Sequence, residues 1–285
     1  MITRTIKLPQ MADSEIPKAV EWRLAQQYAV DLKSQIMSFI VLGEKEDRGV
    51  KQIEILSTTV PKEVVVEYFG LLKYSGLKPI AIEPDCFSLV FSYLENYQCK
   101  PEEVVVLLNI GARFTMFNII AGTHLSFNRK ILCGGRDFLS ALANNLNLSF
   151  EEAEKKLKTF GIPKIDWQRV VSQAEEVSPS EEKQVFKTIQ PVLEKLITEF
   201  RSSFDFYSYQ MTHSTVQRID KILIGGGASQ IKNLDEFLSA RLETPVEIFN
   251  PLKNIQIAEE IDKKLIGQFA PQLGVAIGSA LRRTI

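Results

Sequence analysis

Residues that commonly bind metals are scarce in this sequence. Its 285 residues include three cysteines, Cys86, Cys99 and Cys133, and two histidines. None of them has the spacing of a zinc site. These numbers argue against a zinc cluster and against a disulfide framework, and they favour a reducing, cytoplasmic compartment.

An excess of charge of one sign is also missing. The chain has 34 Lys and Arg residues against 35 Asp and Glu residues, which gives a net charge of -1 at pH 7. Such a balance offers no general attraction to nucleic acid or to an anionic membrane. No apolar run approaches the ~18 residues of a membrane span, and the first residues lack the apolar core of a signal peptide. We therefore expect no nucleic-acid partner and no direct membrane insertion.

The first 83 residues predict a small α/β unit. Residues 2–8 alternate between apolar and polar side chains, as a strand does, and a helix with Val20 and Leu24 on one face follows. Two alternating runs then predict a hairpin, Pro61 opens a second helix, and residues 79–82 look like a fourth strand. This order, βαββαβ, is typical of a ferredoxin-like unit. It contains no nucleophile or phosphate loop, so we interpret it as a packing or docking module.

From residue 100 onward the pattern changes. Residues 104–108 form a continuous apolar run, which predicts a central strand buried on both faces. Two more strands, a Gly134-Gly135 break, a helix and a strand at 222–224 follow, with a charged helical segment at about 149–215. Ser149 and Glu152 begin that segment as a capping pattern in which the glutamate falls one place short of a strict capping box. Without the segment, the order of elements is that of a ribonuclease-H-like domain.

Two glycine-bearing turns stand out in this second part. One contains Gly111 and the other contains Gly225, Gly226 and Gly227, and each follows an apolar strand. Ligands of open α/β sheets bind at the carboxyl ends of the strands. Glycine lets backbone N–H groups approach phosphate oxygens because no Cβ intervenes. Either turn alone is a weak motif that also occurs for structural reasons, but the pair favours a phosphate-binding edge.

Five stretches of the sequence carry a family resemblance. They are ITRTIKLP at 2–9, NIGARFT at 109–115 followed by GG at 134–135, NLNLSFEEAEKKLK at 145–158, ILIGGGASQIKNLDEFLSARLETPVEIFNP at 222–251 and APQLGVAIGSALR at 270–282. In these stretches the chain resembles the PilM family of type IV pilus assembly proteins, which belongs to the actin-like ATPase superfamily. The resemblance runs through nearly the whole chain.

The resemblance implies a domain plan and a nucleotide site. Residues 1–83 would be the ferredoxin-like subdomain inserted in the first half of the fold, residues 84–99 a connecting helix, and residues 100–285 the actin-like second half with its helical insertion. Adenine nucleotide lies between the two halves in that superfamily. The implied nucleotide-binding residues are Gly111, Ala112, Arg113 and Thr115 in the second phosphate turn, Gly225, Gly226 and Gly227 in the adenosine turn, and Arg201 and Ser203 beside the base.

Two departures from the family pattern affect this expectation. About sixty residues with a first phosphate turn of the form Asp-Ile-Gly-Ser usually come first, so we expect a fragment of a longer protein rather than a natural minimal version. Asn109 stands where the family usually has an acidic residue that helps hold magnesium, and asparagine is a poorer ligand for this ion. We expect ATP or ADP with Mg²⁺ to bind weakly or not at all, and we identify no catalytic residue and no metal ligand.

The resemblance also implies a cellular role. PilM-like proteins bind the short cytoplasmic tail of PilN, an inner-membrane protein, between the first-half core and the inserted subdomain. A cytoplasmic scaffold, peripheral to the inner membrane through its partner, is therefore the leading hypothesis. A slow ATPase or a phosphotransferase is the first alternative, although carboxylates such as Asp137 look like first-turn helix residues. A self-assembling filament protein is the second.

Overall fold

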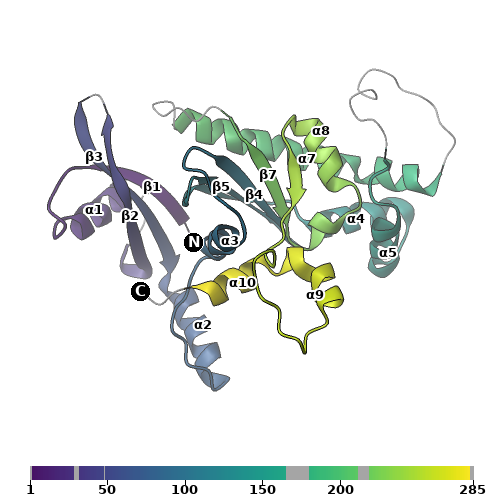
Figure 1. The fold of residues 1–285 in the computed structure, drawn as a ribbon, viewed down its shortest axis with the longest axis horizontal. Coiled ribbons are helices and arrows are strands. Elements are labelled where there is room, and N and C mark those ends of the chain that lie inside the picture. Colours follow the sequence, from purple (N-terminus) through teal and green to yellow (C-terminus); the bar gives the residue numbers. More distant parts are fainter. Residues whose placement is uncertain (1, 29–31, 48, 165–179, 211–217, 283–285) are drawn as a thin grey trace. The chain divides into compact units, whose positions relative to one another are not determined.

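The chain forms two compact units, Met1–Pro84 and Asp85–Ile285. The structure is a computed structural model, and it describes residues 2–28, 32–47, 49–164, 180–210 and 218–282 (Figure 1).

The first unit is a three-stranded antiparallel sheet in the order β1-β3-β2. Its elements are β1 (Ile2–Pro9), α1 (Ile16–Tyr28), the 3-10 helix η1 (Leu32–Ser34), β2 (Gln35–Asp47), β3 (Val50–Pro61) and α2 (Lys62–Tyr74). Helix α1 packs Val20 and Leu24 against Ile6 and Ile55 of the sheet. The alternation of apolar residues along each strand therefore identified the face that α1 covers.

The fourth strand expected at residues 79–82 does not form. No helix or strand occurs between α2 and Asp85, and Ile80 is 80% exposed. The segment is short and lies between Pro79 and Pro84, and proline has no N–H with which to join a sheet ladder. The apolar run alone was therefore too weak a basis for predicting a strand.

The second unit contains a five-stranded sheet in the order β6-β5-β4-β7-β8. Strand β4 pairs with β5 in antiparallel fashion and with β7 in parallel fashion. The elements up to the second glycine turn are α3 (Asp85–Asn96), β4 (Val104–Ile110), β5 (Thr115–Ala121), β6 (His124–Ile131), α4 (Gly135–Leu146), α5 (Phe150–Phe160), α7 (Glu181–Gln210) and β7 (Lys221–Gly225). They are followed by η2 (Gly227–Gln230), α8 (Leu234–Leu242), β8 (Val246–Ile248), α9 (Lys263–Phe269), η3 (Ala270–Gln272) and α10 (Gly274–Leu281). The ribonuclease-H-like order predicted from the sequence is confirmed.

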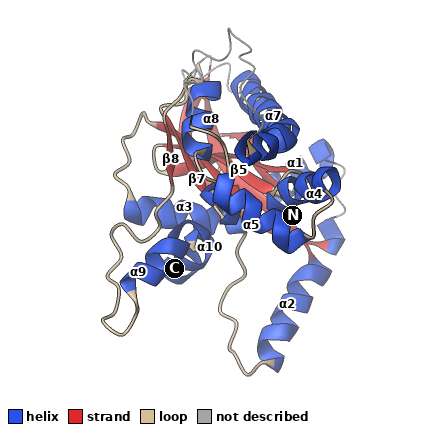
Figure 2. Cartoon of the chain, turned by 90° about the vertical axis from the view of Figure 1, so that its right-hand side faces the viewer, coloured by secondary structure: helices blue, strands red, loops and turns tan. Residues whose placement is uncertain are grey.

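Strand β4 is buried on both faces, as its continuous apolar run predicted. Val106 and Leu108 belong to the core that α4, α5, α7 and α8 complete, while Val105 and Leu107 are buried on the opposite face. Figure 2 shows α3 and α10 on that opposite side of the sheet. These two helices approach so closely that a side chain at position 278 would overlap the carbonyl of Ser88, and Gly278 makes this approach possible.

The helical insertion begins with a capping box and is tied to α8 by an ion pair. Ser149 and Glu152 form a full capping box, because the Ser149 amide donates to the Glu152 carboxylate (2.8 Å) and the Glu152 amide donates to Ser149 Oγ (3.2 Å). The expectation that the glutamate falls one place short was wrong, since Glu152 is the third helical residue. On α7, Glu194 accepts two hydrogen bonds of 2.7 Å from Arg241 of α8. The insertion is thereby held against α8.

Candidate functional site

The two glycine turns lie side by side at one edge of the five-stranded sheet. Strands β4 and β7 are parallel neighbours, and their ladder ends with Asn109 opposite Gly225. Each strand therefore delivers its turn to the same carboxyl edge, where ligands of such sheets bind.

Gly226 brings the two turns into contact. Its φ angle is 84°, and a Cβ at this position would overlap the carbonyl oxygen of Ile110. Its amide donates to the carbonyl of Pro271 at 2.7 Å. A side chain is excluded here both by the positive φ and by the neighbouring backbone, so the approach of the two turns depends on this glycine.

Gly134 and Gly135, which the sequence indicated as a break before a helix and as part of the family resemblance, complete this edge. The amide of Gly135 donates to Gly111 O at 2.8 Å, and a Cβ at Gly134 would lie 2.7 Å from the nitrogen of Phe114. A Cβ at Gly135 would lie 3.5 Å from Cβ of Ala228, which follows the second turn. A glycine pair directly after a strand was the sequence feature that could have placed them here. We call residues 109–114, 134–136 and 225–228 the glycine edge.

The predicted residues of the first turn divide into two groups. Ala112 and Arg113 are exposed and Gly111 is half-buried, so a ligand can reach this turn. Thr115 is fully buried, and its hydroxyl donates to the carbonyl of Cys133 at 2.7 Å. Thr115 therefore holds β5 against the end of β6 and does not face the edge.

The second turn is open only at Gly227. Gly225 and Gly226 are buried, whereas Gly227 is exposed, and the nearest atom to a Cβ built there is Gln272 Cδ at 3.9 Å. Gln272 donates to the side chain of Gln230 at 2.9 Å, which ties η3 to η2. Backbone and amide groups therefore dominate this part of the glycine edge.

The residues at the glycine edge do not fit a magnesium ion. Asn109 lies between the turns, with its Oδ1 3.5 Å from a Cβ built at Gly225, and its amide is a neutral ligand. The Asp137 carboxylate accepts a hydrogen bond from the Gly134 amide at 2.8 Å. In the described part of the chain, no group of three or more His, Cys, Asp or Glu side chains could hold a metal ion. Magnesium prefers several oxygen ligands that include carboxylates.

The structure does not bring Arg201 and Ser203 to the glycine edge. Arg201 Nη2 donates to the carbonyl of Arg241 at 2.7 Å, near the end of α8, which runs away from the second turn. Ser203 is fully buried, where it donates to Glu199 O at 2.6 Å and accepts from Arg129 at 3.2 Å. Arg201 lies toward the amino ends of β7 and β8, while Ser203 faces Arg129 of β6, and neither has a contact with the glycine edge.

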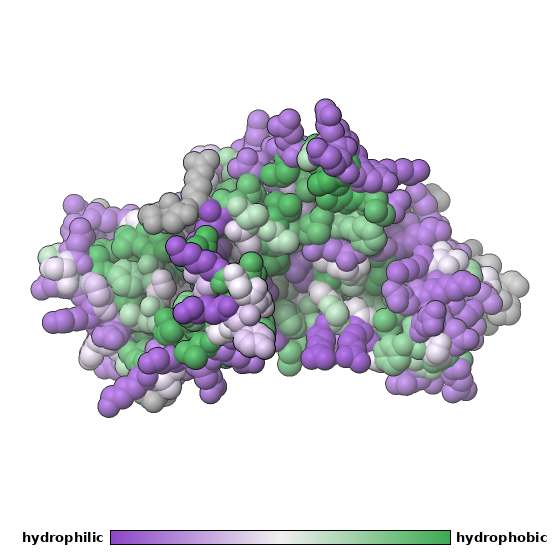
Figure 3. Space-filling view, turned by 90° about the horizontal axis from the view of Figure 1, so that it is seen from below, coloured by the Kyte–Doolittle hydropathy of each residue, from purple (hydrophilic) through white to green (hydrophobic). Residues whose placement is uncertain are grey.

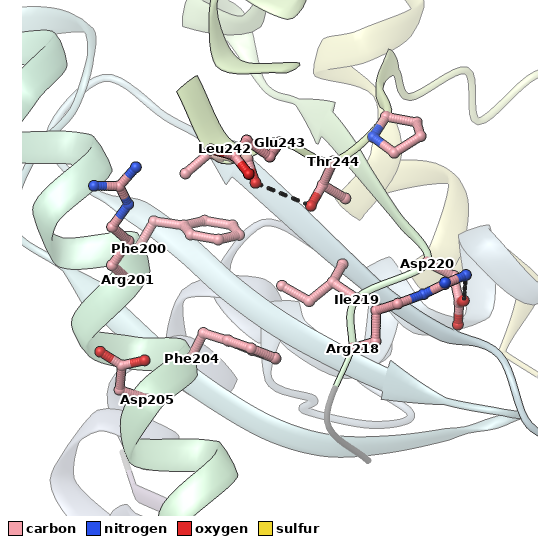
Figure 4. A pocket seen from close by; sticks show the side chains of 11 residues that line it. Phe200, Arg201, Phe204, Asp205, Arg218, Ile219, Asp220, Leu242, Glu243 and Thr244 are labelled. Atoms are coloured by element: carbon pink, nitrogen blue, oxygen red, sulfur yellow. Dashed lines mark hydrogen bonds and ion pairs between the residues drawn. The ribbon is translucent and has the colours of Figure 1, made fainter. Parts of the chain in front are cut away.

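A cavity of about 530 Å³ lies beside Arg201 at the opposite edge of the sheet (Figure 4). The rings of Phe200 and Phe204 point toward Ile219 across it. It is lined by Phe200, Arg201, Phe204, Asp205, Arg218, Ile219, Asp220, Leu242, Glu243, Thr244 and Pro245. Because residues 218–220 precede β7 and residues 243–245 precede β8, the cavity lies at the amino ends of these strands, separate from the glycine edge.

The end of α5, rather than Arg201, lies beyond the second turn. The Ile162 amide donates to Lys232 O at 3.0 Å, and the Asn233 side chain donates to Ile162 O at 2.6 Å. A Cβ at Gly161, whose φ is 57°, would lie 2.6 Å from Cβ of Lys232. The sequence gave no spacing rule that links residues 161–162 to 232–233, so this neighbour was missed.

Cys133 lies directly beneath the glycine edge as a buried thiol. Burial raises its pKa from the ordinary value of 9.0 to about 11, and the nearby Asp137 carboxylate adds to the rise. A thiol with so high a pKa is a poor nucleophile at neutral pH. Its place beneath the edge is therefore structural.

Comparison with known proteins gives the family of the chain. The family described as "Type IV pilus assembly protein PilM" matches residues 1–284. The chain belongs to this family. The resemblance that the sequence suggested is confirmed.

Solved structures show the same fold. One described as "PilM-PilN type IV pilus biogenesis complex" is similar with a TM-score of 0.79 at 24% identity, over 99% of this chain and 76% of that chain. The ethanolamine utilization protein EutJ from Carboxydothermus hydrogenoformans has a TM-score of 0.50 at 17% identity, over 78% of this chain and 61% of its own. MreB5 of Spiroplasma citri bound to ADP has a TM-score of 0.56 at 14% identity, over 78% of this chain and 65% of its own. The fold of this PilM-family chain is therefore actin-like.

Replacing Gly226 should separate the two turns. We expect Gly226→Ala to lower the free energy of unfolding by at least ~2 kcal/mol, because alanine combines a positive φ with overlap at Ile110. Gly227→Ala is the matched control, since a Cβ at Gly227 would make only an ordinary contact, with Gln272 Cδ at 3.9 Å. Urea unfolding measures both, and equal stabilities of the two variants would contradict the contact.

The stability of the second unit should fall at high pH through Cys133. The thiol loses its proton near pH 9 in the unfolded chain and near pH 11 in the folded chain. Between these pH values the folded chain keeps a proton that the unfolded chain has lost, so the free energy of unfolding decreases as pH rises. We expect a loss of about 1 kcal/mol per pH unit from this group. Urea unfolding at pH 8 and pH 10 measures it, and Cys133→Ala should reduce the pH dependence. An unchanged dependence in that variant would contradict the assignment.

Proposed function

We propose that this PilM-family chain is a scaffold of type IV pilus assembly that binds an adenine nucleotide at the glycine edge and the cytoplasmic tail of a PilN-like inner-membrane protein. The observation that carries the nucleotide part is the junction of the two turns, in which Gly226 lies against Ile110 and Gly135 lies against Ala228. Three glycine-bearing segments thereby meet at the one sheet edge where phosphates can approach backbone groups.

The composition of the edge supports weak, non-catalytic binding. The approach is open at Ala112, Arg113 and Gly227, all of them exposed. Phosphoryl transfer needs a positioned base and usually a metal, whereas Asp137 is engaged with the Gly134 amide. No specific observation in the described structure favours the ATPase or phosphotransferase alternative, and the MreB5 structure with ADP concerns a protein of the same fold.

A partner in the inner membrane would place the chain at that membrane. No helix in the described ranges is long and apolar enough to cross a bilayer. The related structure is a complex of PilM with PilN, and we propose an equivalent partner and a cytoplasmic location for this chain.

Helix α2 of the first unit offers a surface for such a tail. None of its residues is buried, and Val66, Tyr68, Phe69 and Leu71 are exposed. Exposed apolar patches of this kind commonly mark interaction sites. Figure 3 shows apolar side chains gathered in patches between hydrophilic ones on one face of the chain.

Nucleotide binding can be tested by calorimetric titration with ADP. We expect weak binding that Gly227→Asp reduces about fivefold or more, because the new carboxylate repels phosphate at the turn. Gly267→Asp on α9 is the control, since Gly267 is exposed and has open space around its Cα. Absence of ADP binding to the parent chain, or an equal effect of both substitutions, would refute the nucleotide proposal.

Partner binding can be tested with a fluorescent peptide of the cytoplasmic PilN-like tail from the same organism. We expect the anisotropy to rise on addition of the chain, and Leu71→Asp to weaken binding about tenfold, because it puts a charge into an apolar contact. Leu71 is 60% exposed, so the substitution should leave folding intact, and Ile261→Asp, at a 44% exposed position, serves as control. Equal binding of a scrambled peptide would contradict a specific site.

A further inference from the structure

Basic side chains surround the first turn of the glycine edge. Arg113 belongs to the turn and Arg136 to the start of α4, and both are exposed. Lys130 of β6 lies with its Nζ 4.0 Å from the centroid of the Phe114 ring, and Lys195 of α7 donates to the carbonyl of Leu132 at 3.0 Å. Arg113, Lys130 and Arg136 therefore lie around the first turn, and Lys195 contacts the chain at Leu132, just before the Gly134-Gly135 pair.

These four cations have little opposing charge. Over the described ranges, none of Arg113, Lys130, Arg136 and Lys195 forms an ion pair. Asp137 is the carboxylate that follows Arg136, and it accepts from the Gly134 amide. A turn with unpaired positive charge around it favours an anionic ligand.

The backbone brings both arginine residues to the first turn. The Arg136 amide donates to Ala112 O at 2.7 Å, and a Cβ at Gly134 would lie 2.8 Å from the carbonyl carbon of Arg113. The two arginine backbones therefore lie beside the same turn. Guanidinium groups bind phosphate through two parallel hydrogen bonds, so two such groups can hold a polyphosphate without help from a metal.

The same edge is a poor place for magnesium. Asn109 supplies a neutral amide at the junction of the turns, and the described residues hold no cluster of carboxylates for the ion. Charge compensation by the protein and charge compensation by a bound metal are alternatives for the same phosphates. The side chains at this edge supply positive charge themselves and lack the carboxylates that would bind a magnesium ion.

We propose that the glycine edge neutralises its ligand with Arg113 and Arg136, supported by Lys130 and Lys195, and therefore takes the metal-free form of a nucleoside polyphosphate in preference to its magnesium complex. This inference rests on the proposed nucleotide function and specifies the form of the ligand. Magnesium cancels two negative charges of the nucleotide, so the complex gains less from the basic side chains than the free anion does.

The preference can be measured by titrating ATP into the chain in EDTA and in excess Mg²⁺ at equal ionic strength. We expect the dissociation constant to be about threefold to tenfold lower in EDTA, the range that exposed charge interactions give. The double variant Arg113→Gln with Arg136→Gln should lose this difference and bind metal-free ATP about tenfold more weakly.

A charge-matched control is available at the other edge of the sheet. The double variant Arg201→Gln with Arg218→Gln also removes two positive charges, but beside the separate cavity. ATP binding and its preference for EDTA should both persist in this variant. Tighter binding in Mg²⁺ than in EDTA would overturn the inference while leaving the nucleotide function in place. No ATP binding in either condition would overturn the nucleotide function itself. An equal loss in both double variants would show that total charge, and not the glycine edge, is responsible.

Discussion

The parallel pairing of β4 with β7 is the constraint on which the rest of the second unit depends. It aligns the carboxyl ends of two strands that are more than a hundred residues apart in the chain, and Gly226 then packs against the backbone of Ile110. Parallel strands need long connections, and here the connection contains β5, β6, α4 and the helical insertion. The insertion is thus accommodated in a crossover while the sheet edge keeps its geometry.

Much of this fold could be predicted from the sequence because its strands and helices have strong periodicity. The run at residues 104–108 identified a strand buried on both faces, and the order of elements identified the ribonuclease-H-like sheet. Residues 79–82 misled because this short apolar segment begins with Pro79, which has no N–H for a sheet ladder, and is soon followed by Pro84. Prediction from the apolar pattern was reliable for elements long enough to repeat that pattern several times.

The candidate site was predictable only in part, for a related reason. Gly111 and Gly225–Gly227 follow strands, so the rule for open sheets placed them at one edge. Arg201 and Ser203 were assigned through the family resemblance alone, and they lie on a thirty-residue helix. The contacts of Arg201 with Arg241 and of Ser203 with Arg129 are long-range pairs that no local spacing encodes. The role of Gly134 and Gly135 also depends on such a long-range contact.

The hydrogen bonds from Gly135 and Arg136 to the first turn have a further consequence for binding. They engage the first amides of α4 with the carbonyls of Gly111 and Ala112, so the turn is held in place before any ligand arrives. A ligand at this edge then pays little conformational entropy to order the backbone. Free and bound forms of the second unit should superpose closely at the turn, and any signal sent to a partner must arise from movement elsewhere in the chain.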